Sequence, residues 1–239
     1  MKIQFEDLNN QQEALSAMLK SLVTSVGAVD ALFHIDLNKP EVWLGKSWLK
    51  CLKQRQSILF SSSRLEETFE GYRKRLKSMD IELSKSVRKD LYSWSSVNSH
   101  AAKRIREGGY ERVVSVSIPL ATCSDLRGRF LYFYDGVSEQ SEFEIRRSIE
   151  NSLNEMIVYQ TAVSASHLIT SPLEDYGMLK SATISIIRHL SQGCSRTELS
   201  EVHHMTPRGI DYHLERAKCL LGAKNTHNLV HKSHSLLLI

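Results

Sequence analysis

The sequence predicts an α+β protein with two domains. Residues 113–120 and 128–134 are rich in β-branched and aromatic residues and flank a polar turn, a pattern typical of two antiparallel strands. Residues 178–239 instead contain three or four short amphipathic helices. Proline, glycine and acidic residues interrupt the pattern over residues 170–177, as they do in linkers. We therefore expect a mixed domain over residues 1–169, a linker over 170–177 and an all-helical domain over 178–239.

The composition is that of a water-soluble folded chain. Hydrophobic residues make up 41% and charged residues 24% of the sequence, close to the average for globular proteins. No window approaches about eighteen uninterrupted apolar residues, and the N-terminus turns acidic where a secretory signal would turn apolar. We expect a cytoplasmic protein that does not enter a membrane. The four cysteines show no CxxC pairing, so the sequence indicates neither a structural zinc site nor a disulfide framework.

Hydrophobic spacing predicts the remaining elements of the first domain. The longest helical pattern runs over residues 138–167, and it could cover the sheet, form a dimer seam, or do both. The other predicted elements are helices over 7–26, 64–77 and 99–106 and a strand over 31–37.

Charge and helix signals both single out the C-terminal region. Residues 178–239 hold eight Lys/Arg against four Asp/Glu, so the whole positive excess of +4 lies there and would attract a polyanion. In the third of its helices, Thr206 can cap the N-terminus and Pro207 suits the first helical position. The expected helices cover 182–191, 196–203, 208–221 and 226–233.

The C-terminal region resembles the helix-turn-helix domain of LuxR-family transcriptional regulators. The matching segments are 179–187, 189–200, 205–214, 221–225 and 237–239, and they align with the family pattern without a gap. The resemblance implies a four-helix domain whose third helix enters the major groove of double-stranded DNA. It also implies a homodimer on a two-fold symmetric operator, with RNA polymerase as a further partner.

The same alignment gives candidate DNA contacts. Arg suits guanine or phosphate because its fork is bidentate, and Lys suits phosphate as a point charge. The alternative is that these side chains are only solvated charges on an exposed face. The candidates are Arg196, Thr197, Thr206, Arg208, Asp211, Tyr212, Arg216 and Lys218.

The chain departs from the family pattern at two places in this domain. His203 and His204 replace the usual Leu-Gly of the turn, so we expect a positive φ at His204, at a cost of about 1 kcal/mol relative to glycine. Thr183 replaces a glutamate of the first helix. A metal site at Cys194, His203 and His204 is conceivable, but the spacing matches no common metal-binding pattern and favours ordinary histidines.

The first domain resembles the autoinducer-binding domain of the same family, through residues 91–95, 109–110, 115–120 and 128–131. The resemblance implies an α/β/α sandwich with an antiparallel sheet, helices on both faces, and a pocket for an acyl-homoserine lactone or another small signal. Trp94, Tyr72 and Asp80 match the family's polar pocket residues, while Thr68, Ser115 and Leu131 replace other pocket residues. The alternative is that these residues surround a filled or degenerate pocket.

These observations predict a homodimeric DNA-binding regulator, controlled by a small molecule or acting without one. The sequence shows no nucleophile elbow, P-loop, metal cluster or glycine-rich nucleotide loop, so we expect neither an enzyme nor a cofactor. The alternative function is an anti-activator that has lost DNA binding and acts by heterodimerisation with a related regulator. The unusual turn and the missing glutamate motivate that alternative.

Overall fold

The computed structural model describes the chain except for residues 1, 76–80, 95–101, 137–139 and 167. It divides into two compact units, residues 1–169 and 170–239. Among the described residues, no helix combines the length and the apolar character needed to cross a membrane.

A five-stranded antiparallel sheet forms the centre of unit 1, in the order β2-β1-β5-β4-β3. The predicted strands are present, and β5 begins earlier than expected, at Cys123. The two edge strands are too short to leave a pattern in the sequence. The strand bounds are β1 Asp30–Leu37, β2 Leu59–Phe60, β3 Leu91–Ser93, β4 Arg112–Leu120 and β5 Cys123–Tyr134.

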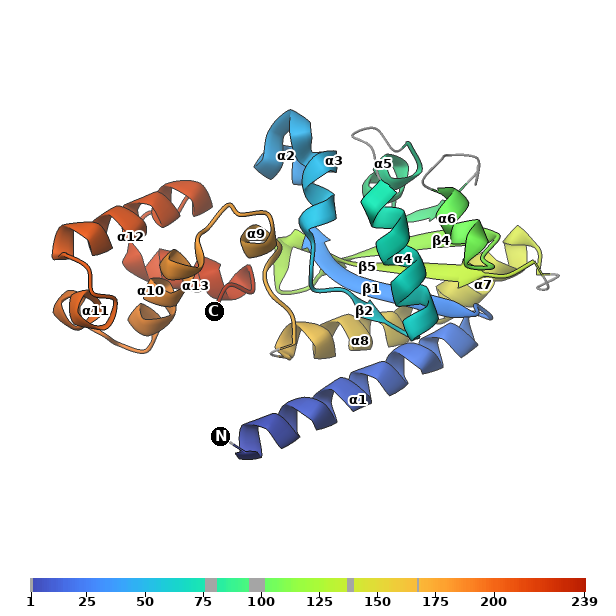
Figure 1. Cartoon of the computed structure of the whole chain (residues 1–239), viewed down its shortest axis with the longest axis horizontal. Coiled ribbons are helices and arrows are strands. Elements are labelled where there is room, and N and C mark those ends of the chain that lie inside the picture. Colours follow the sequence, from blue (N-terminus) through green and yellow to red (C-terminus); the bar gives the residue numbers. More distant parts are fainter. Residues whose placement is uncertain (1, 76–80, 95–101, 137–139, 167) are drawn as a thin grey trace. The chain divides into compact units, whose positions relative to one another are not determined.

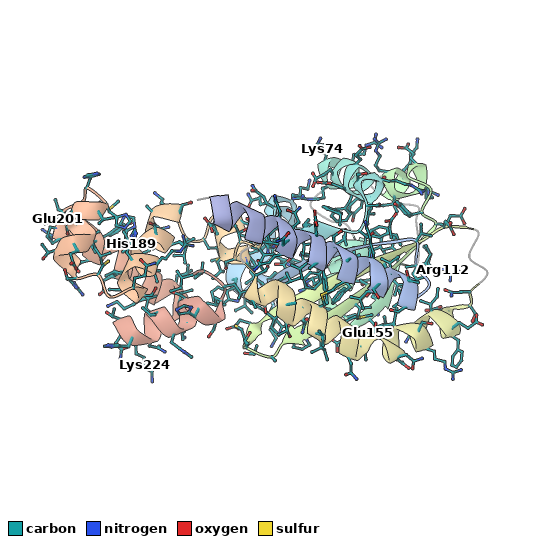
Figure 2. The ribbon with its side chains drawn as sticks, turned by 90° about the horizontal axis from the view of Figure 1, so that it is seen from below. Lys74, Arg112, Glu155, His189, Glu201 and Lys224 are labelled. Atoms are coloured by element: carbon teal, nitrogen blue, oxygen red, sulfur yellow. The ribbon has the colours of Figure 1, made fainter. Side chains whose placement is uncertain are left out.

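Helices cover both faces of this sheet, because successive side chains of a strand point to opposite sides (Figure 1). On one face, Leu32 packs in a buried cluster that includes Phe69 and Tyr72 of α4. On the other face, the Phe33 ring lies 5.0 Å from the Tyr159 ring of α8. Figure 2 shows α1 beside α8 across that second face. The helices of unit 1 are α1 Lys2–Ser25, α2 Pro40–Leu44, η1 Gly45–Ser47, α3 Trp48–Cys51, η2 Leu52–Gln54, α4 Ser63–Arg75, α5 Ile81–Arg88, α6 Ala102–Glu107, α7 Glu142–Asn151 and α8 Leu153–Ala165.

In place of the single long helix expected over residues 138–167, the structure has two helices, α7 and α8. The prediction of one continuous helix is therefore wrong. Helix α7 starts at a capping box, in which the Ser141 hydroxyl accepts the Glu144 N–H. It ends before Ser152, whose φ of −93° and ψ of 4° interrupt the helical geometry. The apolar spacing continues across this break, which is why the sequence did not reveal it.

Unit 2 contains five helices in its described part, and the last four match the predicted ones to within two residues. Residues 170–177, which we expected to form a linker, include the short helix α9 and pack within unit 2. The Leu173 side chain is fully buried there, and the Ser171 hydroxyl donates to the Leu236 carbonyl at 2.8 Å. The helices are α9 Pro172–Asp175, α10 Ser181–Ser191, α11 Arg196–Val202, α12 Pro207–Leu221 and α13 Thr226–Ser235.

Candidate nucleic-acid interface and candidate ligand pocket

Helix α12 is fixed at both ends by its own sequence. The Thr206 hydroxyl accepts the Gly209 N–H at 3.1 Å, and Pro207 occupies the first helical position, as predicted. Gly222 ends the helix in the left-handed region, at φ 60°. One side of the helix packs into the core of unit 2 through Ile210, Leu214, Ala217 and Leu221.

A tight turn joins α11 to α12. Ser195 and Glu198 form a capping box at the start of α11, and His203 ends the helix. His204 then adopts φ 50°, which confirms the positive φ expected where the family pattern has glycine. The turn is therefore formed despite its unusual residues.

Three predicted DNA contacts stand exposed along α12. Arg208 and Arg216 are exposed, and the structure records no hydrogen bond or ion pair for either guanidinium within the described part of the chain. Tyr212 lies between them in sequence and is 61% exposed. These side chains remain available to a ligand.

The other candidate side chains on these helices have partners in the structure, except Thr197, which is exposed in the first turn of α11. The Arg196 guanidinium forms an ion pair with the Asp211 carboxylate, which joins the start of α11 to α12. The Lys218 ammonium pairs with Glu215 one turn earlier on α12. Sequence spacing gave no indication of the first pair, because its members are fifteen residues apart.

Histidines form side-chain contacts inside unit 2 that the sequence analysis did not anticipate. His189 Nδ1 lies 3.0 Å from His203 Nε2, and Figure 2 shows His189 among the helices of this unit. Burial and the neighbouring His189 lower the pKa of His203 below its ordinary value. Thr183, at the position of the family's glutamate, bonds to His213 Nδ1 at 2.8 Å. The described residues contain no group of three or more His, Cys, Asp or Glu side chains placed to hold a metal ion, including at Cys194.

Unit 1 contains a small cavity between the sheet and helices α4 and α5. Its volume is about 40 Å³. Tyr72, Ser115 and Leu131, three of the predicted pocket residues, line it. The full lining is His34, Asp36, Arg55, Ile58, Phe69, Tyr72, Arg73, Ser86, Val87, Ser115, Val116, Ser117, Arg129 and Leu131.

Two other predicted pocket residues, Trp94 and Thr68, do not line this cavity. Trp94 packs behind Tyr72, with ring centroids 5.8 Å apart, and its buried indole N–H has no hydrogen-bond partner within the described residues. Thr68 lies against the backbone of Gly108, where an added Cβ would approach its side chain to 2.6 Å. Asp80 falls outside the described residues.

One end of the cavity is cationic, which the sequence analysis missed. Arg129 is only 4% exposed and donates hydrogen bonds to the Val87 and Leu37 carbonyls at 2.8 and 2.7 Å. Arg55 is 2% exposed, and its Nε donates to the Ile35 carbonyl at 3.0 Å. For Arg129, the sequence did offer a signal, because this arginine lies within a predicted strand of otherwise apolar and aromatic residues.

His34 lies at the same end of the cavity. Its Nδ1 atom is buried, has no hydrogen-bond partner in the described structure, and lies 3.8 Å from the Asp36 carboxylate. Burial, and then the nearby charges of Arg55, Arg129 and Arg73, hold the pKa of His34 well below its ordinary value. The imidazole is therefore neutral near pH 7.

No family model matches this chain, and no curated protein is similar to it at a significant level. Among the solved structures that are similar to it are two of SdiA. One is SdiA in complex with octanoyl-rac-glycerol, with a TM-score of 0.49, 12% identity, and coverage of 94% of this chain and 88% of that one. The other is Escherichia coli SdiA, with a TM-score of 0.48, 12% identity, and coverage of 95% and 92%. At this level of likeness, any statement about function depends on the geometry of the two sites described above.

Proposed function

We propose that the chain is a cytoplasmic DNA-binding transcriptional regulator of the LuxR quorum-sensing type, acting as a homodimer and not as an enzyme. The observation that carries the proposal is the exposed face of α12. It presents two guanidinium groups that have no partner among the described residues, on a capped helix that follows a tight turn from α11. RNA polymerase would be a further partner of such a regulator.

The spacing of the exposed side chains suits a major groove. Arg208, Tyr212 and Arg216 recur every four residues and so form one stripe along the helix. The two arginines are separated by about 12 Å along the axis, at 1.5 Å per residue, comparable with the groove width of about 12 Å. Each guanidinium fork can bind guanine O6 and N7 or a phosphate.

Arg196 and Thr197 support a second set of contacts, at the start of α11. Asp211 holds one edge of the Arg196 guanidinium, which leaves its other N–H groups for a phosphate oxygen. The N-terminal end of a helix also favours anions. In this proposal Thr206 acts mainly as the cap that fixes the start of α12, while Lys218 offers its charge next to Glu215.

Exposed apolar side chains on the α7–α8 segment support dimerisation. Phe143 is 73% exposed and Val158 is 59% exposed, with Leu153 and Ile157 exposed between them. Large apolar side chains grouped on one segment of a soluble protein mark an association surface more often than isolated ones do. A second copy of the chain covering this segment would give the two-fold symmetry that an operator with two half-sites requires.

Small-molecule control is the remaining part of the proposal. The cavity is far smaller than the roughly 300–1,000 Å³ of typical ligand pockets, so an acyl-homoserine lactone would have to displace part of its wall. A molecule of a few heavy atoms is a better match to the cavity as it stands.

DNA binding is tested by selecting binding sites from a random-sequence duplex library at low salt, followed by anisotropy titrations with the selected site. Arg208→Ala and Arg216→Ala should each weaken specific binding by about 1–3 kcal/mol if the contact is bidentate, and relax preference at one base pair. Arg188→Ala is the matched control, because it removes the same charge from an exposed position on α10.

Two results would count against the proposal. The first is the absence of any enriched sequence with the wild-type protein at low salt, which would contradict DNA recognition. The second is an equal loss of affinity in all three variants, which would show a general effect of charge and no specific role of α12. Heterodimer formation with a related regulator, without DNA binding, would support the anti-activator.

A further inference from the structure

We propose that helix α13 carries a binding site for a divalent transition-metal ion, which the imidazoles of His227 and His231 chelate from successive turns of the helix. The ions concerned are Zn²⁺, Ni²⁺ and Cu²⁺, which imidazole ligands suit. The site does not depend on the proposed function, because it uses none of the candidate DNA contacts.

Three histidines form one exposed stripe on α13. His227, His231 and His234 follow one another at intervals of four and three residues, so they lie on one face of the helix. All three are exposed, whereas Leu229 and Ser233 are fully buried on the opposite side. The structure records no hydrogen bond or ion pair for any of the three imidazoles within the described part of the chain. They are therefore available to a ligand.

The spacing of the first two histidines is that of a metal chelate. Residues four apart on a helix have Cβ atoms about 5–6 Å apart, and the same interval brings together the two zinc-binding histidines of the His-Glu-x-x-His motif. His231 and His234, three residues apart, form a second pair that shares His231. His227 and His234 are separated by about 10.5 Å along the axis, at 1.5 Å per residue, which is about twice the separation within either pair. His231 is thus the residue on which both pairs depend.

The surroundings of the stripe favour a metal that prefers nitrogen ligands. The ten residues of α13 include no Asp or Glu, the side chains that Mg²⁺ and Ca²⁺ require. The one lysine of the helix, Lys232, donates from its ammonium group to the Leu221 and Gly222 carbonyls at 2.8 and 3.1 Å, so its charge is directed to the end of α12. The described residues contain no group of three His, Cys, Asp or Glu side chains placed around one ion, so water fills the remaining coordination positions.

The helix that carries the pair is ordered without an ion. The Asn225 side chain accepts the Asn228 N–H at 2.8 Å and so caps the first turn, in which His227 lies. A pair on an ordered helix loses less conformational freedom on binding than a pair on a flexible segment. Histidine is also a weaker helix former than lysine or glutamate, so helix propensity does not account for three histidines on an exposed face.

The test is a calorimetric titration of the full chain, without an added histidine tag, with NiCl₂ and separately with MgCl₂. The titration is made at about pH 7.5, because protons compete with metal ions for imidazole. Ni²⁺ should bind, whereas Mg²⁺ should not. Absence of Ni²⁺ binding, or equal binding of the two ions, would overturn the proposal.

Three variants separate chelation from the mere number of histidines. His231→Gln should weaken Ni²⁺ binding about tenfold or more, because the second ligand of a chelate binds at high effective concentration and this variant leaves no pair. His227→Gln should have a smaller effect, since the pair of His231 and His234 remains, and His234→Gln should have the smallest. The matched control is His204→Gln, which removes an exposed histidine outside α13 and should leave the affinity unchanged. Equal losses in the three α13 variants, or full affinity in His231→Gln, would contradict a chelating pair.

Amide hydrogen exchange locates the ion independently. An ion held by two successive turns binds the helical form better than the unfolded form, so saturating Ni²⁺ should slow the exchange of the α13 amides about fivefold or more. The same slowing is expected in His204→Gln and should be lost in His231→Gln. Unchanged exchange of α13 in the presence of bound Ni²⁺ would show that the ion binds elsewhere.

Discussion

Replacing His204 by glycine should stabilise unit 2. The residue is exposed, and it adopts φ 50°, a conformation that costs a residue with a Cβ about 1–2 kcal/mol. Glycine removes that cost. It also lowers the free energy of unfolding by about 0.4–1 kcal/mol, because it gives the unfolded chain more conformational freedom. The expected net gain is about 0.5–1 kcal/mol, which corresponds to about 2–8 °C in the melting temperature of a small cooperative unit.

Amide hydrogen exchange measures this change locally. The Met205 N–H donates to the Ser200 carbonyl at 3.0 Å across the turn, so its exchange reports on opening between α11 and α12. The gain should slow its exchange about two- to fivefold in His204→Gly. His204→Ala is the matched control, because alanine removes the imidazole and keeps the Cβ. Equal stabilisation by alanine and glycine, or faster exchange in His204→Gly, would refute the argument from backbone strain.

Three further perturbations test other parts of the fold. Thr206→Ala removes the hydroxyl that accepts the Gly209 N–H, so α12 should lose about 1 kcal/mol by hydrogen exchange, while Thr206→Ser should retain most of it. Phe33→Ala should lower the free energy of unfolding of unit 1 by about 3–5 kcal/mol in urea titrations, because the ring is fully buried; a loss below 1 kcal/mol would contradict its place in the core. Bonds from Ser195 lower the pKa of Glu198 from its ordinary 4.5, so its contribution to stability is complete above that pH and is lost as the pH falls through the lower folded value. Melting curves of Glu198→Gln should lack this part of the acid dependence.

Local patterns in the sequence were sufficient for most of the helices. The cap at Thr206 and the positive φ at His204 each follow from one residue type in a short segment. The break at Ser152 did not, because apolar spacing continues across it and serine interrupts a helix only weakly. The strand Leu59–Phe60 is likewise too short for any periodicity to emerge.

The two candidate sites differ in how much of them could be predicted. The exposed stripe of α12 comes from one continuous segment, so helical spacing places Arg208 and Arg216 on its exposed face, while the family resemblance makes them candidate DNA contacts. The arginine-lined end of the cavity combines residues from separate segments: the strand register places His34 beside Arg129, and the segment between η2 and β2 brings Arg55 to the same end. Pairings of this kind depend on tertiary structure, as does the bond between Thr183 and His213.

The Arg129 guanidinium connects the contents of the cavity to the lifetime of the protein. It holds carbonyl oxygens from the end of β1 and from α5, so the cavity wall and the fold of unit 1 depend on the same side chain. A molecule that binds only the folded form stabilises it by about 2.7 kcal/mol when present at a hundred times its dissociation constant. Differences of 1–2 kcal/mol are enough to change the cellular abundance of a protein several-fold through proteolysis. A ligand in this cavity would thus raise the cellular abundance of the protein, in addition to any effect on its conformation.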